Sequence, residues 1–338
     1  MLGSEMTHLV AGGIGGTVAA LITSPLEVVK VRLQASAARV ANFDQNSEQN
    51  KITSTKYNYF YKLFQKNRKQ SFGVIKNIKL IVATEGKLGL FRGVVPTLVG
   101  VIPSRSIYFW AYNYAQSYFN EIFVPYSNAV FFCSAALSSG LSSTVTNPIW
   151  FIKTRLQLDF GAGKKKLKVW KIVKDTYQTK GIRGFFRGVT ASYAGISETG
   201  IHFMIYESLK IHFINKFHNT NISKDISSSN NNHISKLQNY TDMFGCMGAS
   251  MISKTISTTL AYPHEVARTR LREEGTKYRG FFQTIHLVYR EEGILGLYRG
   301  LTTHYLRQVP NTCIIIGVYE GTVLLFDRWG LVDPKTDD

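Results

Sequence analysis

Long uncharged stretches are the first pattern along this chain. No Asp, Glu, Lys or Arg occurs between Glu5 and Glu27, or between Glu121 and Lys153. Both gaps exceed the roughly 20 residues that a helix needs to cross a bilayer. They therefore predict two membrane-spanning helices.

Four further apolar stretches carry one internal charge each. They cover residues 93–120, 188–206, 243–264 and 300–319, and the charges are Arg105, Glu198, Lys254 and Arg307. A charge within a span is costly, so it commonly faces a cavity and marks a functional position. The chain is thus predicted to have six spans, with both termini on one side of the membrane.

Two polar segments separate these spans. Residues 36–70 are dominated by Asn, Gln, Ser and Lys, and residues 217–237 are similarly polar. Because such compositions cannot bury a core, we expect a solvated insertion and a linker.

A short run recurs near the ends of the first, third and fifth spans. Its copies begin at Pro25, Pro148 and Pro263, and basic residues follow five and seven positions later. The second position after the proline is Glu27 in the first copy, Trp150 in the second and Glu265 in the third. Three copies predict three homologous units, each with two spans and a short connecting helix.

A second signal follows each copy. It is a charged residue followed by glycine and then, after four intervening residues, by an aromatic residue, a basic residue and glycine. The copies are Glu85-Gly86 with Phe91-Arg92-Gly93, Lys180-Gly181 with Phe186-Arg187-Gly188, and Glu292-Gly293 with Tyr298-Arg299-Gly300. We expect repeats over residues 1–119, 120–216 and 238–331, with residues 217–237 as the linker.

The acid and base of the first run are three residues apart, so they project from one face of a helix. One interpretation is an ion pair within each helix. Threefold recurrence favours a ring in which each acid meets the base of the next unit. Such a ring would close one end of a central cavity.

The two signals together resemble the signature of the mitochondrial carrier family, and the middle repeat departs from it at Trp150 and Lys180. The resemblance implies an all-α membrane protein with six transmembrane helices in three pseudo-threefold-related repeats and short matrix-side helices. It implies a monomer in the inner mitochondrial membrane, with both termini on the intermembrane-space side. It also implies alternating access and contact with lipids such as cardiolipin.

Carried over to this sequence, the matrix-side gate would pair Glu27 with Lys153 and Glu265 with Lys30. In the family a glutamine braces each pair. Gln34 and Gln157 fit that place, while the third repeat has Arg272.

Arg268 then has no acid, because Trp150 replaces it. We hypothesise that the indole of Trp150 holds the Arg268 guanidinium by cation–π attraction, worth about 0.5–2 kcal/mol. The alternative is that Trp150 packs against a neighbouring helix or lipid.

The family motif at the opposite, cytosolic gate is an aromatic, an acid and, three residues after the acid, a base. Tyr206, Glu207 and Lys210 match it. The corresponding residues are Tyr112, Asn113 and Gln116 in the first repeat, and Tyr319, Glu320 and Val323 in the third. Lys210 would face Asn113, Glu320 would face Gln116, and Glu207 would face Val323. Since neutral hydrogen bonds are weaker than charge-assisted ones, we expect this gate to open more easily.

The family's substrate contact points fall on Gly100, on Gly195 and Ile196, and on Arg307. Arg105 and Glu198 are close by, and Lys254 lies about 16 Å deeper than Glu265 on the same helix face. The alternative for each charged residue is a hydrogen bond or salt bridge between helices.

Several cations around a cavity suit a polyanion, because phosphate oxygens accept charge-assisted hydrogen bonds from Arg and Lys. The glycines would leave room for a flat ring, so a nucleotide fits better than a small carboxylate. Residues 147–150, 194–199, 262–275 and 307–312 resemble the pyrimidine nucleotide carriers, which exchange nucleotides of the UTP, CTP and dTTP class. The Trp-bearing motif also occurs in carriers of NAD, FAD and folate, which gives the alternative.

The net charge of +18 suits either a phosphate-rich partner or an anionic lipid surface. A nucleic-acid binder would need a recognition motif on a soluble fold, which is missing. Cys133, Cys246 and Cys313 are far apart and lack metal-ligand spacing. With no catalytic constellation or phosphate loop, we expect no enzyme activity, metal or cofactor. A non-transporting membrane scaffold is the alternative from another class.

Overall fold

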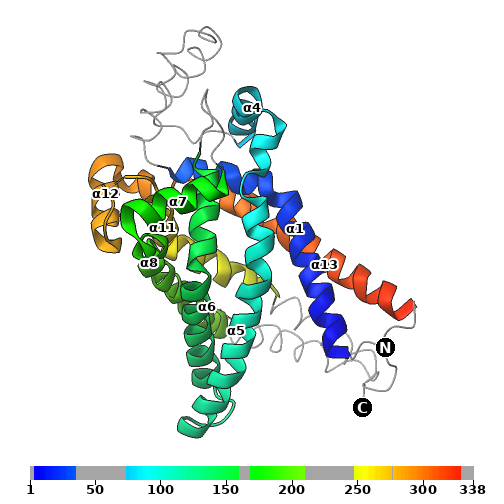
Figure 1. Cartoon of the computed structure of the whole chain (residues 1–338). Coiled ribbons are helices and arrows are strands. Elements are labelled where there is room, and N and C mark those ends of the chain that lie inside the picture. Colours follow the sequence, from blue (N-terminus) through cyan, green and yellow to red (C-terminus); the bar gives the residue numbers. More distant parts are fainter. Residues whose placement is uncertain (1–3, 36–73, 160–167, 210–246, 276, 329–338) are drawn as a thin grey trace, which may run out of the picture.

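The protein is described by a computed structural model over residues 4–35, 74–159, 168–209, 247–275 and 277–328. Within these ranges all regular structure is helical, as predicted (Figure 1). The predicted insertion at 36–70 and the linker at 217–237 lie outside the described residues.

The described helices can be grouped by the three expected units, whose bounds stay a prediction. The first contains α1 (Ser4–Gln34), α4 (Val74–Glu85), η1 (Lys87–Phe91) and α5 (Val94–Ile122). The second contains α6 (Asn128–Gln157), α7 (Val169–Lys180), η2 (Ile182–Phe186), α8 (Val189–Ala194) and helical residues 196–209. The third contains helical residues 247–261, α11 (Pro263–Leu271), α12 (Phe281–Leu297) and α13 (Leu301–Arg328).

Glycines of the second signal set the same turn in all three units. Gly93, Gly188 and Gly300 have φ of 87°, 86° and 85°. Other L-residues avoid this left-handed region, so glycine is needed where the chain turns from the short helix into α5, α8 or α13. The repeat seen in the sequence is therefore also a repeat of backbone geometry.

The three prolines of the first signal behave differently. Pro25 and Pro148 lie inside the long helices α1 and α6. At the third copy α11 begins at Pro263, directly after a single turn residue, Tyr262, whose backbone dihedrals are in the α region. A proline suits the first position of a helix, since the hydrogen-bond donor that it lacks has no partner there in any case.

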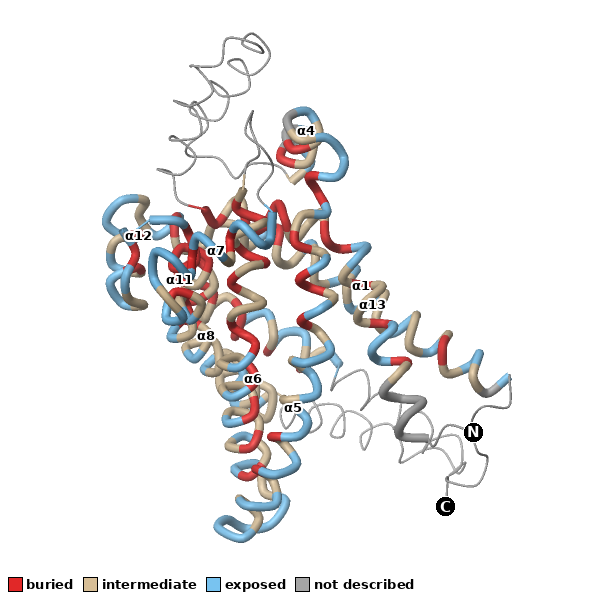
Figure 2. The backbone as a smooth tube through the Cα atoms, in the orientation of Figure 1, coloured by how far each residue is buried: buried red, intermediate tan, exposed pale blue. Residues whose placement is uncertain are grey.

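The long helices form two packed pairs that converge at one end. α1 packs along α13 and α5 packs along α6, whereas α1 meets α5, α6 and α11 over only a few residues. Figure 1 shows the two pairs meeting near α7 and α11 and diverging toward their other ends. Burial follows this arrangement, because buried backbone gathers around the convergence and the far ends are largely exposed (Figure 2).

A stripe of small hydroxyl side chains joins α6 to α5. Ser134, Ser138, Ser142 and Thr146 are buried at every fourth position of α6. The Ser142 hydroxyl donates to the Ser104 carbonyl oxygen at 2.8 Å. Small residues at such spacing let two membrane helices approach closely.

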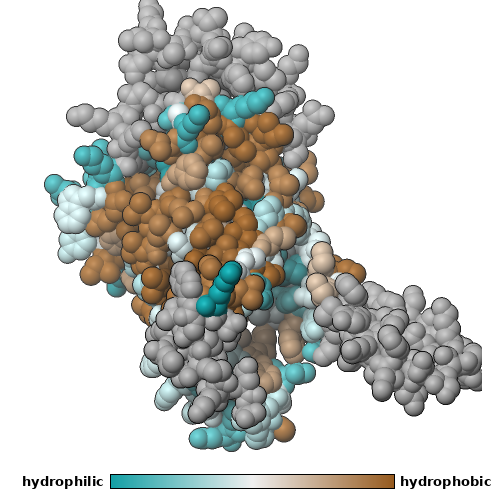
Figure 3. Space-filling model, turned by 90° about the vertical axis from the view of Figure 1, so that its right-hand side faces the viewer, coloured by the Kyte–Doolittle hydropathy of each residue, from teal (hydrophilic) through white to brown (hydrophobic). Residues whose placement is uncertain are grey.

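Four helices in the described ranges are long and apolar enough to cross a membrane, namely Val10–Gln34, Lys87–Ile122, Asn128–Gln157 and Leu301–Phe326. The described parts of the other two predicted spans are helical on both sides of Gly195 and of Tyr262, and the backbone dihedrals of both residues are in the α region. Large apolar side chains such as Ile22, Ile316 and Leu324 are exposed on α1 and α13. Figure 3 shows a broad hydrophobic region over the face that includes these helices, as expected of a surface that contacts lipid.

Candidate functional site

A ring of buried charges lies where the helices converge. Lys153 Nζ on α6 is 2.5 Å from Glu27 Oε1 on α1, and Lys30 on α1 forms an ion pair with Glu265 on α11. The four side chains are between 8 and 16% exposed. Each pair joins two repeats, so the two predicted inter-repeat ion pairs are confirmed. We call Glu27, Lys30, Trp150, Lys153, Glu265 and Arg268 the charged ring.

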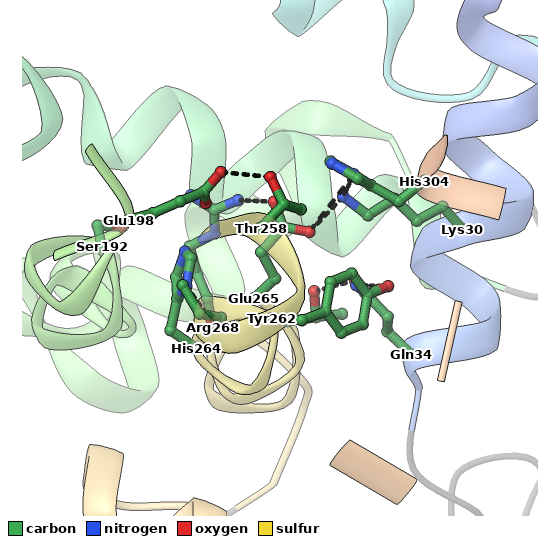
Figure 4. Close-up of polar contacts among 12 residues, drawn as sticks. Lys30, Gln34, Ser192, Glu198, Thr258, Tyr262, His264, Glu265, Arg268 and His304 are labelled. Atoms are coloured by element: carbon green, nitrogen blue, oxygen red, sulfur yellow. Dashed lines mark hydrogen bonds and ion pairs between the residues drawn. The ribbon is translucent and has the colours of Figure 1, made fainter. Parts of the chain in front are cut away.

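Two residues of α13 extend this ring. Arg307 Nη1 lies 3.5 Å from Glu27 Oε2. His304 Nδ1 lies 2.6 Å from Lys30 Nζ, and Figure 4 shows the two side chains reaching toward each other. A charged Lys30 can only donate, so Nδ1 is the acceptor and the His304 ring is neutral. Sequence reasoning placed Arg307 in the cavity but assigned no role to His304, which stands one helical turn before it.

Trp150 does not make the predicted contact. Lys153 Nζ lies 5.0 Å from the centre of the Trp150 ring, and Trp150 Nε1 donates to Thr146 Oγ1 at 3.0 Å. Arg268 Nη2 lies 3.7 Å from Glu265 Oε1 on its own helix. The hypothesis that Trp150 stacks on Arg268 is therefore wrong in this conformation. The alternative of helix packing is correct, because the far edge of the indole lies against Gly100 of α5.

Arg272 joins the third repeat to the second in place of an ion pair. Arg272 Nη2 donates to Asn147 Oδ1 at 2.8 Å, and Nη1 donates to Thr154 Oγ1 at 3.2 Å and to the Trp150 carbonyl oxygen at 3.4 Å. The side chain is buried. This interface between α11 and α6 is thus held by hydrogen bonds from a cation to neutral groups.

The two glutamines occupy the places that the resemblance implied. Gln34 Nε2 donates to the Tyr262 hydroxyl at 3.0 Å, and Gln34 Oε1 accepts from Thr269 Oγ1 at 2.8 Å. Gln34 therefore connects α1 to the third repeat without touching the ion pair itself. Gln157 is buried beside Glu27 and contacts its carboxylate.

A cavity of about 300 Å³ lies inside the charged ring. Five cations line it, namely Lys30, Lys153, Arg268, Arg272 and Arg307. Two carboxylates, Glu27 and Glu265, also line it, together with neutral groups such as Trp150 and Ser192. The lining thus carries an excess of positive charge and suits an anionic ligand.

Lys254 and Glu198, two of the predicted substrate contacts, make polar contacts that join helices to each other. Lys254 Nζ lies 2.8 Å from Glu198 Oε1, which also accepts from Thr258 Oγ1 at 2.8 Å (Figure 4). The salt-bridge alternative therefore holds for Lys254 and Glu198 in this conformation. Arg105 is exposed on α5.

The glycines do not leave the space that we expected for a flat ring. A Cβ on Gly100 would lie 2.9 Å from Ile149 Cγ2, and one on Gly195 would lie 2.8 Å from His264 Nε2. Ile196 reaches toward Gly140 of α6, to 3.7 Å from where a Cβ would stand. Helix packing accounts for these small residues, because neighbouring side chains already fill the room beside them.

Comparison with known proteins identifies the family. The family model described as mitochondrial carrier protein matches residues 4–123, 125–217 and 240–328. The chain belongs to the mitochondrial carrier family. It is therefore related to multi-pass mitochondrial membrane proteins that act as carriers rather than as enzymes.

Curated relatives span nearly the whole carrier. Solute carrier family 25 member 36-A of Danio rerio is 47% identical over 323 residues, which are 95% of this chain and 98% of that protein. Solute carrier family 25 member 33 of Homo sapiens is 45% identical over 332 residues, 96% of each chain. Mitochondrial carrier protein rim2 of Schizosaccharomyces pombe is 35% identical over 325 residues, 93% of this chain and 88% of that protein.

The opposite end of this carrier lacks a comparable ring in the described part of the chain. Asn113 and Glu320 are exposed, and Gln116 and Glu207 are partly exposed. The described contacts include no ion pair or side-chain hydrogen bond that joins these four residues to another repeat. Of the other residues predicted for this gate, Tyr206 has its ring 6.2 Å from that of His202, and Tyr319 lies near Gly15. Lys210 is outside the described residues.

Buried carboxylates form a second layer of contacts beyond the ring. Glu85 binds Arg32 at 2.6 Å and Arg92 at 3.2 Å in the first repeat. In the third, Glu292 binds Arg270 at 2.8 Å and Arg299 at 3.1 Å. We call each set an acidic clasp. The sequence showed the motif that contains Glu85 and Glu292 but not their arginine partners. The equal spacing between Glu85 and Arg92 and between Glu292 and Arg299 was the signal that could have indicated these pairs.

Proposed function

We propose that this carrier exchanges pyrimidine nucleotides of the UTP, CTP and dTTP class across the inner mitochondrial membrane by alternating access. The observation that carries the proposal is the cavity at the charged ring, where five cations face two carboxylates. A nucleotide polyphosphate would offset this excess, because its oxygens accept charge-assisted hydrogen bonds from several cations at once. The resemblance of residues 147–150, 194–199 and 307–312 to pyrimidine nucleotide carriers supports the choice of base.

Arg307 is the residue that we assign to the substrate phosphates. Its contact of 3.5 Å with Glu27 is longer than the 2.5 Å contact between Lys153 and Glu27. A guanidinium can bind phosphate in a bidentate manner, which is a stronger interaction than this loose ion pair. Substrate that takes Arg307 away from Glu27 leaves the carboxylate with Lys153 alone. Binding would thereby lower the free energy of opening the ring.

The charged ring is the matrix gate in this proposal, with Gln34, Gln157 and Arg272 as its braces. The cytosolic gate comprises Asn113, Gln116, Tyr206, Glu207, Lys210, Tyr319 and Glu320. A ligand shifts the balance between two states only by binding them with different affinity. Without substrate the ring keeps its ion pairs, so each half-cycle needs a bound nucleotide and the carrier exchanges rather than leaks.

The remaining assignments concern the wall of the cavity, the repeats and the orientation in the membrane. We assign to the wall three charged residues, Lys254, Glu198 and Arg105. They meet the substrate after the Lys254–Glu198 contact described above has rearranged. We infer repeats over residues 1–119, 120–216 and 238–331, a monomer, contact with cardiolipin, and both termini on the intermembrane-space side.

Exchange in liposomes tests the proposal. The purified full-length protein is reconstituted in vesicles loaded with UTP and offered UTP, CTP, ATP, NAD or folate outside. We expect fast exchange with UTP and CTP. Exchange of ATP alone, or of NAD or folate alone, would overturn the pyrimidine assignment, and no exchange of any compound would favour a scaffold.

Arg307→Gln should lower UTP exchange by about 10- to 100-fold, the cost of one hydrogen-bonding partner of a charged group. Arg290→Gln is the matched control, since Arg290 is exposed on α12. Equal rates for the two variants would contradict the role of Arg307.

A further inference from the structure

A second cavity, of about 340 Å³, lies between α5, α6 and helical residues 196–209. It is toward the ends of α5 and α6 that point away from the convergence of the helices (Figure 1). Its lining includes Tyr108 and Tyr112 of α5, Phe132 and Ala135 of α6, and Thr199 and Phe203 of the third helix. We call this cavity the aromatic pocket.

The aromatic pocket lies along the same helix faces as the cavity inside the charged ring. On α6, Ser143 lines the ring cavity and Phe132, in the pocket, is eleven residues before it. Ser192 also lines the ring cavity, and Thr199 is seven residues after it, across Gly195 with its α-region backbone. Because eleven and seven residues are about three and two helical turns, the two side chains of each helix project from one face. At about 1.5 Å per residue, the cavities are separated by roughly 10–17 Å along the helices.

The two cavities differ in charge. Five cations line the ring cavity, whereas none of the described residues that line the aromatic pocket is charged. The polar side-chain groups of the pocket are the hydroxyls of Tyr108, Tyr112 and Thr199. A phosphate would lose its hydration in the pocket without gaining a cation, which is unfavourable. The pocket therefore suits an uncharged, flat and partly apolar group.

The aromatic rings are placed so that such a group can stack on them. The rings of Tyr108 and Tyr112 are stacked, with centroids 6.0 Å apart and an interplanar angle of 19°. Phe132 is 38% exposed and Phe203 is partly exposed, so neighbouring side chains do not cover these rings completely. Phe132 also reaches Gly200, to 3.0 Å from where a Cβ would stand, and this close approach brings α6 to the helix of Phe203.

We propose that the aromatic pocket holds the base of the nucleotide while the charged ring holds its phosphates. This inference rests on the nucleotide exchange proposed for the carrier. The room beside Gly100 and Gly195 cannot take the base, because Ile149 and His264 fill it. Nucleobases stack on aromatic side chains through their flat faces, which every base has. Ribose and triphosphate then bridge the separation between the two cavities.

The three hydroxyls suit both uracil and cytosine. A hydroxyl group can donate a hydrogen bond to the O4 of uracil or accept one from the N4 amino group of cytosine. An amide or a guanidinium in the same place would have fixed donors and would favour one base. The pocket is therefore expected to accept UTP and CTP with similar affinity.

Binding of UTP and of tripolyphosphate, which carries phosphates but no base, separates the two cavities. The Tm of the full-length protein in detergent, titrated with each ligand, gives the apparent Kd. Phe203→Leu removes the ring and keeps an apolar side chain. It should weaken UTP binding by about 5- to 150-fold, the loss of one base–aromatic stack, and leave tripolyphosphate binding unchanged.

Two comparisons serve as controls. Phe282→Leu makes the same change at an exposed position of α12, so it should bind both ligands as the parent does. At Tyr108, Tyr108→Phe keeps the ring and should bind UTP more tightly than Tyr108→Leu. Equal UTP binding by the two Tyr108 variants would contradict stacking on this ring.

Two results for Phe203→Leu would overturn the proposal. Parental UTP binding would leave a lipid acyl chain as the occupant of the apolar pocket. An equal loss of UTP and tripolyphosphate binding would show a structural effect and no contact with the base.

Failure of the exchange proposal gives a different result. Arg307→Gln should weaken the binding of both ligands, because both carry phosphates. Unchanged binding there would contradict the role of Arg307 without altering the comparison in Phe203→Leu. Exchange of ATP in place of UTP would overturn the pyrimidine assignment, and ATP compared with tripolyphosphate in Phe203→Leu would then test the pocket.

Discussion

The outer repeats and the middle repeat share a backbone but differ in acids. Gly93, Gly188 and Gly300 have nearly the same φ, so the turn into the second long helix is common to all three repeats. The outer repeats contribute Glu27 and Glu265 to the ring, and Glu85 and Glu292 to clasps. The middle repeat has Trp150 and Lys180 at those positions. The comparison teaches that glycine geometry is common to the repeats, whereas the ring carboxylates join adjacent repeats and the clasp carboxylates join elements within one repeat.

The missing ring acid weakens one of three interfaces. Ion pairs join α1 to α6 and α1 to α11. Between α6 and α11, Arg272 instead donates to Asn147, Thr154 and a backbone carbonyl oxygen. A hydrogen bond between a cation and a neutral group is weaker than one between two ions. We therefore expect the ring to open first between the second and third repeats.

The largest effect is expected from making an outer repeat resemble the middle one. Glu27→Gln leaves the buried Lys153 and the partly exposed Arg307 without their carboxylate, which should cost about 3–5 kcal/mol of stability. The measurement is Tm in detergent together with UTP exchange, which should fall at least tenfold.

Adding Lys153→Gln to the Glu27→Gln variant removes the cation that has lost its carboxylate partner. The double variant should recover part of the lost stability, as expected for residues in contact. Strictly additive losses from the two changes would show that Glu27 and Lys153 are not coupled.

Sequence reasoning predicted the two ion pairs of the ring, whereas the bounds of the repeats stay a prediction. Proline, acid and base at fixed spacing are dictated by helix geometry, so Glu27–Lys153 and Glu265–Lys30 could be paired once threefold symmetry was assumed. The symmetry argument failed at Trp150, because an aromatic side chain has no unique partner. Its ring contacts Lys153 on the same helix and packs on Gly100.

The glycine positions show a second limit of sequence reasoning. Gly100 and Gly195 were read as space for a substrate ring, but Ile149 and His264 fill that space. A missing side chain indicates close approach without saying what approaches. The clasps of Glu85 and Glu292 were missed for a related reason, since their partners include residues of other helices, Arg32 on α1 and Arg270 on α11, and depend on how those helices pack.

A smaller effect is expected at the interface between the second and third repeats, which lacks an ion pair of the charged ring. Arg272→Met removes the donors to Asn147 and Thr154, which should cost about 1–3 kcal/mol. Arg272→Gln introduces the residue type that the other two repeats have at Gln34 and Gln157. It should lose less stability than Arg272→Met, because the glutamine amide can still donate a hydrogen bond. Tm measurements would compare both with Arg290→Met, an exposed control on α12. A parental Tm for Arg272→Met would show that this interface does not depend on Arg272.

The most direct measurement completes the ring at its weak interface by comparing Trp150→Glu with Trp150→Gln. Both variants lose the packing of the indole on Gly100, so their difference isolates a carboxylate added near Lys153, in the cavity that Arg268 also lines. The account predicts that the Glu variant has a Tm about 2 °C higher and exchanges UTP more slowly, because a latched ring opens less readily. Equal or lower stability of the Glu variant, with exchange at least as fast, would contradict the claim that the missing acid sets the strength of this interface.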